Sequence, residues 1–194
     1  MNHLARAMHL SGMEAMTGTA DHELRQALAS AVAGDDVAFA RIVAAHHGEM
    51  HRICAFICRD QAMAEDAVQA AWLIAWRKLG SVREAERLRP WLIAVAVNEA
   101  KQLLRKRRRR SEIEVVADAS SEAGGIDPAT GLDSMAVRDA MAKLKPDDRA
   151  LLALRYVAGF DSTELSTAIG LSPPGTRARL SRLLARLRQD LTHG

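Results

Sequence analysis

The chain has 194 residues, of which 48% are hydrophobic and only 4% aromatic, and its formal net charge is +3. This length accommodates one domain or two small ones, and the scarcity of strand-forming runs favours an all-α protein. No run approaches the roughly 18 apolar residues of a membrane span, and the first residues lack the apolar core of a signal peptide. We therefore expect a cytoplasmic protein that is not inserted in a membrane.

Four helices are predicted in the first 110 residues. Apolar spacing and capping residues place them over residues 21–33, 36–59 and 62–79, and from Trp91 into an arginine run. Asp35 and Asp60 are the expected N-caps, and Pro90 fits the first turn of the fourth helix. A basic loop over residues 81–89 joins the third and fourth helices.

Charge is strongly segregated along the chain. Residues 101–110 carry seven basic side chains and no acid, whereas residues 111–135 carry six acids and no base. Residues 111–131 also have the Ser, Gly and Pro content of a linker. We predict a disordered N-terminal extension (1–20), a helical domain (21–110), a flexible acidic linker (111–131) and a second helical domain (132–191).

Residues 159–188 have the pattern of a helix-turn-helix, with a short helix, a turn at Gly170 and a longer helix. Helices are also expected near residues 133–144 and 147–157. On the longer helix, five leucines share one side, whereas Arg179, Arg182 and Arg186 fall on the opposite side. Arginines that face outward suit phosphates and guanine edges, so this helix is predicted to contact DNA.

Three motifs occur in a characteristic order. Residues 64–69 read Ala-Glu-Asp-Ala-Val-Gln and are followed by the aromatic Trp72, and Trp91-Leu92 precedes Asn98 and Leu104-Arg105. The third motif runs from Leu171 into the arginine-bearing helix. In this order the motifs resemble the sigma-70 family of bacterial RNA polymerase sigma factors, specifically the extracytoplasmic-function group. The likeness covers about residues 20–110 and 132–190.

The resemblance implies three sets of contact residues. The set for the β′ subunit of core polymerase is Asp66, Gln69 and Trp72. The set for the promoter −10 element is Arg83, Arg87, Arg89, Trp91, Asn98, Lys101, Gln102 and Arg105. The set for the −35 element is Ser172, Pro174, Gly175, Thr176, Arg177, Arg179, Arg182 and Arg186.

The resemblance also implies a function. The chain would be a factor, not an enzyme, that binds the β′ and β subunits of RNA polymerase and directs initiation at specific promoters. An anti-sigma factor is an expected partner, and neither a cofactor nor a small-molecule substrate is expected. Two alternatives remain open, namely a sigma mimic that sequesters an anti-sigma factor and a stand-alone helix-turn-helix regulator.

A cluster of possible metal ligands precedes the first motif. His51, Cys54 and Cys58 lie near one face of the second predicted helix, but no fourth ligand occurs at a normal spacing. A buried thiol pair beside surface histidines is therefore favoured over a zinc or redox site, and no metal is expected. The two cysteines offer no disulfide framework, which suits a reducing cytosol.

Overall fold

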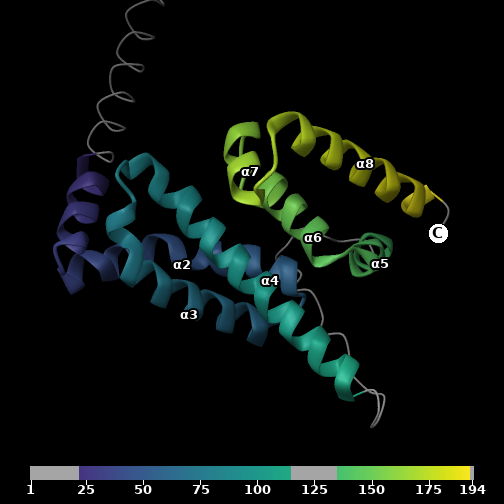
Figure 1. Ribbon diagram of the computed structural model, residues 1–194, viewed down its shortest axis with the longest axis horizontal. Coiled ribbons are helices and arrows are strands. Elements are labelled where there is room, and N and C mark those ends of the chain that lie inside the picture. The colour runs from purple at the N-terminus through teal and green to yellow at the C-terminus, as the bar shows by residue number, and fades with distance from the viewer. Residues whose placement is uncertain (1–21, 115–134, 193–194) are drawn as a thin grey trace, which may run out of the picture.

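The computed structural model describes residues 22–114 and 135–192, and every regular element in them is helical (Figure 1). The N-terminal half contains a helix over residues 22–32, α2 (Asp36–Cys58), α3 (Gln61–Lys78), the 3-10 turns η1 (Leu79–Ser81) and η2 (Ala85–Arg87), and α4 (Leu88–Glu114). The C-terminal half contains α5 (Met135–Lys143), α6 (Pro146–Leu152), the π-helical turn η4 (Ala153–Val157), α7 (Ser162–Ile169) and α8 (Pro173–Thr192). The all-α prediction is confirmed. The predicted extension over residues 1–20 and most of the predicted linker lie outside the described residues.

The helix boundaries follow from local capping. Asp35 and Asp60 accept hydrogen bonds from backbone N–H groups in the first turns of α2 and α3, as predicted. Asp161 and Glu164 form a complete capping box at the start of α7. Gly170 ends α7 with φ of 69°, a left-handed conformation that glycine adopts without strain.

Helix α4 is longer at both ends than the sequence pattern indicated. It begins at Leu88, so Pro90 lies inside the first turn, where a backbone N–H has no helical partner to lose. At the other end it runs on to Glu114, past the predicted linker start at Ser111, whose hydroxyl donates to the Arg108 carbonyl. No Gly or Pro occurs between Ser111 and Glu114 to stop it.

The helix predicted over residues 147–157 is divided in two. Helix α6 ends at Leu152, and η4 continues as a wider turn in which the Ala158 N–H bonds to the Ala153 carbonyl. The chain then turns so that the Phe160 side chain is fully buried. The apolar spacing of the segment does not distinguish this wider turn from a continuous α-helix.

The core of the N-terminal half is built around α3. Its buried side chains are small, namely Ala64, Ala67, Val68, Ala71 and Ala75, which lets α2 and α4 approach closely. Large side chains from both neighbours fill the remaining space, including Met50, Ile53, Ile57, Leu92 and Ile93. The motif residues on α3 are thus held on a rigid, closely packed helix.

The two halves pack against each other. Helix α6 and η4 contact α2, while α6 and α7 contact α4. Buried residues from both halves, such as Leu92, Leu151 and Leu154, belong to one hydrophobic cluster. The positions of the two candidate DNA-binding surfaces are therefore coupled by a shared core.

Two leucines provide a matched test of this packing. Leu92 is fully buried in α4, whereas Leu73 on α3 is 63% exposed. We expect Leu92→Ala to lower the free energy of unfolding by about 3 kcal/mol, because it leaves a cavity in the core. Leu73→Ala is expected to change it by less than about 0.5 kcal/mol. Urea denaturation followed by circular dichroism measures both, and equal losses would contradict the described packing.

Candidate nucleic-acid interface

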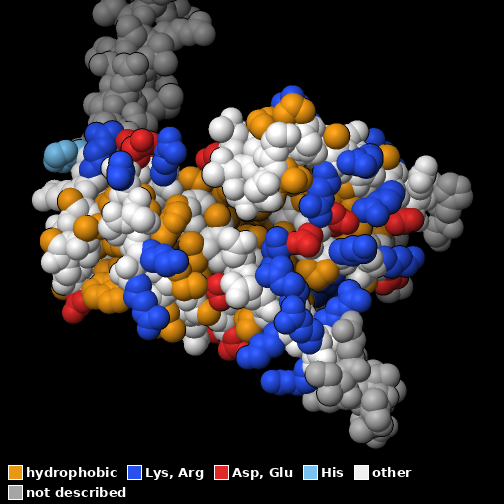
Figure 2. Space-filling view, viewed as in Figure 1, with side chains coloured by type: hydrophobic (Ala, Val, Ile, Leu, Met, Phe, Trp, Pro, Cys, Tyr) orange, Lys and Arg blue, Asp and Glu red, His pale blue; other side chains and the backbone are white. Residues whose placement is uncertain are grey.

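The basic run of α4 forms one cationic surface. Helix α4 buries Leu92, Ile93 and Val97 against the bundle, but all six residues from Arg105 to Arg110 are exposed. Figure 2 shows Lys and Arg side chains gathered along this end of α4 and over the nearby side of α8. A dense array of exposed cations on a folded helix is suited to a polyanion.

The residues predicted for the −10 element divide into two groups. Arg83, Asn98, Gln102 and Arg105 are exposed, and Arg87 is exposed but paired with Glu84. In the second group, Trp91 is half-buried against the core, Arg89 binds Glu49 and the Ala158 carbonyl, and Lys101 pairs with Asp147. The first group therefore faces solvent, whereas Arg89 and Lys101 of the second group are engaged by the C-terminal half.

The helix-turn-helix presents a smaller outward face than predicted. Ser172, Pro174, Arg177 and Arg182 are exposed, and Gly175 is half-buried. Thr176 is only 1% exposed, and its Oγ1 accepts a hydrogen bond from Ser166 on α7. Thr176 therefore stabilises the packing of α7 on α8, and its side chain is unavailable to DNA in this arrangement.

Arg179 and Arg186 both bind an acidic side chain of α6, although Arg186 stays 59% exposed on the predicted outward side. Arg179 Nη2 donates to Asp148 Oδ1 at 2.9 Å, and Arg186 Nη2 donates to Asp148 Oδ2 at 3.0 Å. Asp148 lies on α6, and its side chain is only 11% exposed. These two arginines thus fix α8 on α6, which leaves Arg177 and Arg182 as exposed cations at the start of α8.

The residues predicted to contact polymerase lie on α3. Asp66 and Gln69 are exposed, whereas Trp72 is half-buried. The Trp72 indole N–H donates to His47 Nδ1 at 3.3 Å, and its ring packs edge-on against Phe39 at 5.8 Å. Trp72 therefore anchors α3 on α2 and presents little surface to a partner.

Two further residues of α3 are exposed, and the sequence analysis did not predict them as candidate contact residues. Leu73 is 63% exposed and Trp76 is 44% exposed, although both are large and apolar. They continue the line of Asp66 and Gln69 at helical spacing, so the four side chains form one exposed stripe. The signal was present in the sequence as an apolar pair on the polar side of an amphipathic helix.

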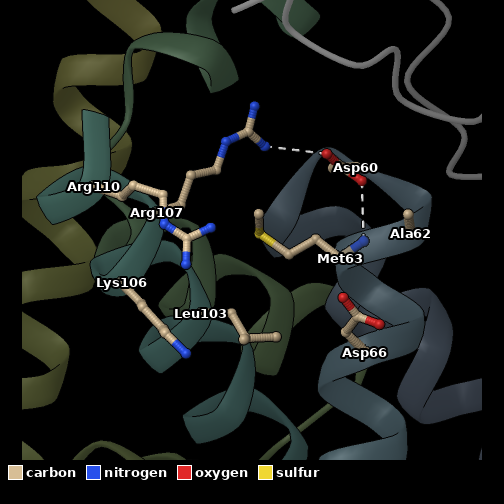
Figure 3. Close-up of a pocket in the computed structure, with 8 residues that line it drawn as sticks. All are labelled: Asp60, Ala62, Met63, Asp66, Leu103, Lys106, Arg107 and Arg110. Atoms are coloured by element: carbon tan, nitrogen blue, oxygen red, sulfur yellow. Dashed lines mark hydrogen bonds and ion pairs between the residues drawn. The ribbon is translucent and has the colours of Figure 1, made fainter. Parts of the chain in front are cut away.

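A shallow pocket connects α3 with the basic end of α4 (Figure 3). Its lining carries both signs of charge on Asp60, Asp66, Lys106, Arg107 and Arg110, and apolar surface on Ala62, Met63 and Leu103. The Arg107 guanidinium pairs with Asp60, which also accepts from the Met63 backbone N–H. Asp60 therefore connects the two helices, because it caps the start of α3 and also pairs with Arg107 at the cationic end of α4.

The predicted buried thiol pair is confirmed. Cys54 and Cys58 are both buried and unbonded to each other. Burial raises the pKa of Cys54 far above its ordinary value and raises the pKa of Cys58 to about 12, so both are thiols at neutral pH. Within residues 22–114 and 135–192, no group of His, Cys, Asp and Glu has the geometry of a metal site.

Comparison with known proteins identifies the family. Residues 42–110 match the family model of Sigma-70 region 2, and residues 134–187 match that of Sigma-70, region 4. The RNA polymerase sigma factor CarQ of Myxococcus xanthus is 31% identical over 162 residues, which cover 81% of this chain and 91% of CarQ. The chain belongs to the sigma-70 family, in its extracytoplasmic-function group.

Other sigma factors show the same similarity. The ECF RNA polymerase sigma factor SigM of Mycobacterium tuberculosis is 28% identical over 162 residues, covering 82% of this chain and 80% of SigM. The probable RNA polymerase sigma factor RfaY of Xanthomonas campestris is 33% identical over 180 residues, covering 89% of this chain. The matched part is only 45% of RfaY, so the chain spans less than half the length of that relative.

The fold is also similar to a solved sigma factor. The sigma factor RpoE of Bartonella quintana, crystallised with the anti-sigma factor NepR, superposes with a TM-score of 0.66 at 24% identity. The match covers 79% of this chain and 96% of RpoE, which supports the two-part helical fold. No helix in the part of the chain described here is long and apolar enough to cross a bilayer.

The Asp148 contacts give a testable prediction. We expect Asp148→Asn to lower the free energy of unfolding by about 1–2 kcal/mol, because two arginines lose a largely buried charged acceptor. The matched control is Asp190→Asn, since Asp190 is exposed near the end of α8. Urea denaturation compares the two variants, and equal effects would show that Asp148 does not anchor α8.

Proposed function

We propose that this sigma factor binds core RNA polymerase and directs initiation at promoters that it recognises through a −10 and a −35 element. The observation that carries the proposal is the presence of two exposed cationic surfaces on separate helical units of one chain, the end of α4 and the start of α8. A protein that binds a single duplex site needs only one such surface. Two surfaces of this kind are suited to two separated segments of one promoter.

The −10 element is assigned to α4 and the loop before it. In that loop Val82 and Ala85 are buried, which fixes the backbone, while Arg83 and Arg87 reach outward. Asn98, Gln102 and Arg105 continue the exposed surface along α4. Amide and guanidinium groups on a fixed helix can hold the phosphates and base edges of a separated strand.

The −35 element is assigned to the outward face of α8. Its first two residues, Pro173 and Pro174, have no backbone N–H, so the helix start offers fewer amide donors to a phosphate than an ordinary helix does. Side chains must supply the contacts, and the exposed ones there are Arg177, Ser181 and Arg182. A guanidinium at either position can donate two hydrogen bonds to a guanine edge.

The polymerase contact is assigned to the exposed stripe of α3. Asp66 and Gln69 supply polar groups, and Leu73 and Trp76 supply apolar area that water would otherwise cover. Large exposed apolar side chains beside polar ones are typical of a protein-binding surface. We assign this stripe to the β′ subunit and expect the C-terminal half to contact the β subunit.

An anti-sigma factor is the further partner that we propose. The RpoE structure contains the anti-sigma factor NepR, and a second structure of similar fold is that of CnrH with the cytosolic domain of CnrY. A partner of this class would act by covering the α3 stripe or the cationic surfaces.

Run-off transcription tests the proposed function directly. Purified core polymerase with this protein is expected to start transcripts at discrete promoters that core polymerase alone does not use. Sequencing of those transcripts would reveal the shared −10 and −35 elements. If no specific start occurs on any genomic template while the protein still binds duplex DNA alone, the stand-alone regulator is the better description.

The −35 assignment predicts different effects for two arginines of α8. Arg182→Ala should lower initiation at a promoter with a −35 element by about tenfold, because a base or phosphate contact is lost. Arg188→Ala, near the exposed end of the same helix, should lower it by less than about twofold. Initiation rates from the assay above measure both, and equal losses would indicate a charge effect without a specific contact.

The polymerase assignment predicts a separate defect. Leu73→Ala combined with Gln69→Ala should weaken binding to core polymerase by about tenfold without loss of stability, since both side chains are exposed. The control is Arg41→Ala, an exposed change on α2. Competition for core polymerase by a fluorescent parent protein measures the affinities, and unchanged affinity for the double variant would refute the assignment.

A further inference from the structure

The helix over residues 22–32 is bound to the loop that precedes α4. We call residues 79–87, which comprise η1, η2 and the residues between them, the −10 loop. Arg25 Nη2 donates to Glu86 Oε1 at 2.7 Å, and Arg25 Nε donates to the same oxygen at 3.3 Å. Glu86 lies in η2, 61 residues further along the chain. The match to Sigma-70 region 2 begins at residue 42, so this contact comes from a helix that precedes the matched segment.

Apolar contacts accompany this ion pair. Val32 lies at the end of the helix, and its Cγ1 is 3.6 Å from the position that a β-carbon on Gly80 would occupy. Leu28 of the helix and Val82 of the −10 loop are buried in the same hydrophobic cluster. The helix therefore contacts the loop at η1 and, through Glu86, at η2.

The short turn η2 carries the side chains that this contact can orient. It contains Glu86 and Arg87, and Arg83 lies two residues before it. Arg87 Nε donates to Glu84 Oε2 at 2.6 Å, which links the two ends of the turn. A single 3-10 turn has poor hydrogen-bond geometry, so its orientation depends on contacts with the rest of the protein. A hydrogen bond to Glu86 therefore constrains the backbone that carries Arg83 and Arg87.

We propose that Arg25 is a positioning residue for strand binding, and that it acts through Glu86 to orient the −10 loop so that Arg83 and Arg87 face a separated DNA strand. The inference rests on the proposed function for the assignment of these two arginines to DNA. Arg25 is engaged by Glu86 and is not itself assigned to DNA. The hydrogen bond from Arg25 lowers the pKa of Glu86 below its usual 4.5, so the pair is charged at neutral pH.

A purely electrostatic role for this pair predicts an effect of opposite sign. If the two residues only contributed charge near a polyanion, each added cation would strengthen strand binding. If Arg25 positions the loop, Glu86→Arg should weaken strand binding despite the added positive charge, because it places two guanidinium groups against each other. Glu23→Arg is the matched control, since it makes the same charge change at an exposed residue two positions from Arg25.

Hydrogen exchange in the free protein tests whether Arg25 anchors the loop. The Arg87 N–H bonds to the Glu84 carbonyl, so its exchange reports opening of η2. We expect Glu86→Arg to raise this exchange rate by about fivefold, whereas Glu23→Arg should leave it unchanged. The double variant Arg25→Glu with Glu86→Arg reverses the pair and should return the rate to within about twofold of the parent. An unchanged rate in Glu86→Arg, or no recovery in the double variant, would overturn the anchor.

Binding of a single-stranded DNA tests the functional consequence. The protein is assembled with core polymerase, and the DNA carries the −10 sequence found in the run-off transcripts. Glu86→Arg should weaken strand binding by about fivefold, the charge-reversed double variant should bind within about twofold of the parent, and Glu23→Arg should bind equally or more tightly. All variants should bind core polymerase with parental affinity, since the α3 stripe is unchanged. Tighter strand binding by Glu86→Arg would overturn the positioning role.

A further comparison separates positioning from a merely structural effect. When Arg83 and Arg87 are both replaced by Ala, the loop has no arginine left to orient, so the addition of Glu86→Arg should weaken strand binding by less than about twofold more. A full additional loss of about fivefold would overturn the positioning role. The two proposals fail in different ways. Absence of specific starts with the parent protein refutes the proposed function, whereas parental strand binding by Glu86→Arg, in a protein that initiates normally, refutes only the role of Arg25.

Discussion

Two adjacent carboxylates at the start of α6 hold cations from both candidate DNA surfaces. Asp147 pairs with Lys101 of α4, and Asp148 receives Arg179 and Arg186 of α8. Without these acceptors, the cations of α4 and α8 would lie close together with only solvent to screen them. These two side chains therefore add specific charged contacts to the shared hydrophobic core, one within the C-terminal half and one between the halves.

The two carboxylates differ in the parts of the chain that they join. Asp148 and its arginines belong to the same half, so their ion pairs persist when the halves separate, and they fix α8 on α6. Asp147 pairs across the interface, so its contact is lost on separation. Loss of the Lys101–Asp147 contact would thus leave the packing of α8 on α6 intact.

Local features of this fold could be predicted from the sequence, whereas contacts between distant residues could not. The caps at Asp35 and Asp60 depend only on the next few residues, and the structure has them as predicted. The spacing of Arg179 places it opposite the leucines, but the spacing does not reveal that Asp148, 31 residues earlier, lies within reach. Likewise, Arg89 donates to a backbone carbonyl of the C-terminal half. Every residue has such a carbonyl, so the sequence does not indicate which one accepts.

The three surfaces differ in accessibility. The stripe of Asp66, Gln69, Leu73 and Trp76 is exposed while the halves are docked, whereas Arg89 and Lys101 are engaged. A partner that binds the α3 stripe would therefore meet no barrier from the C-terminal half, whereas a ligand of Arg89 or Lys101 would compete with the Ala158 carbonyl or with Asp147.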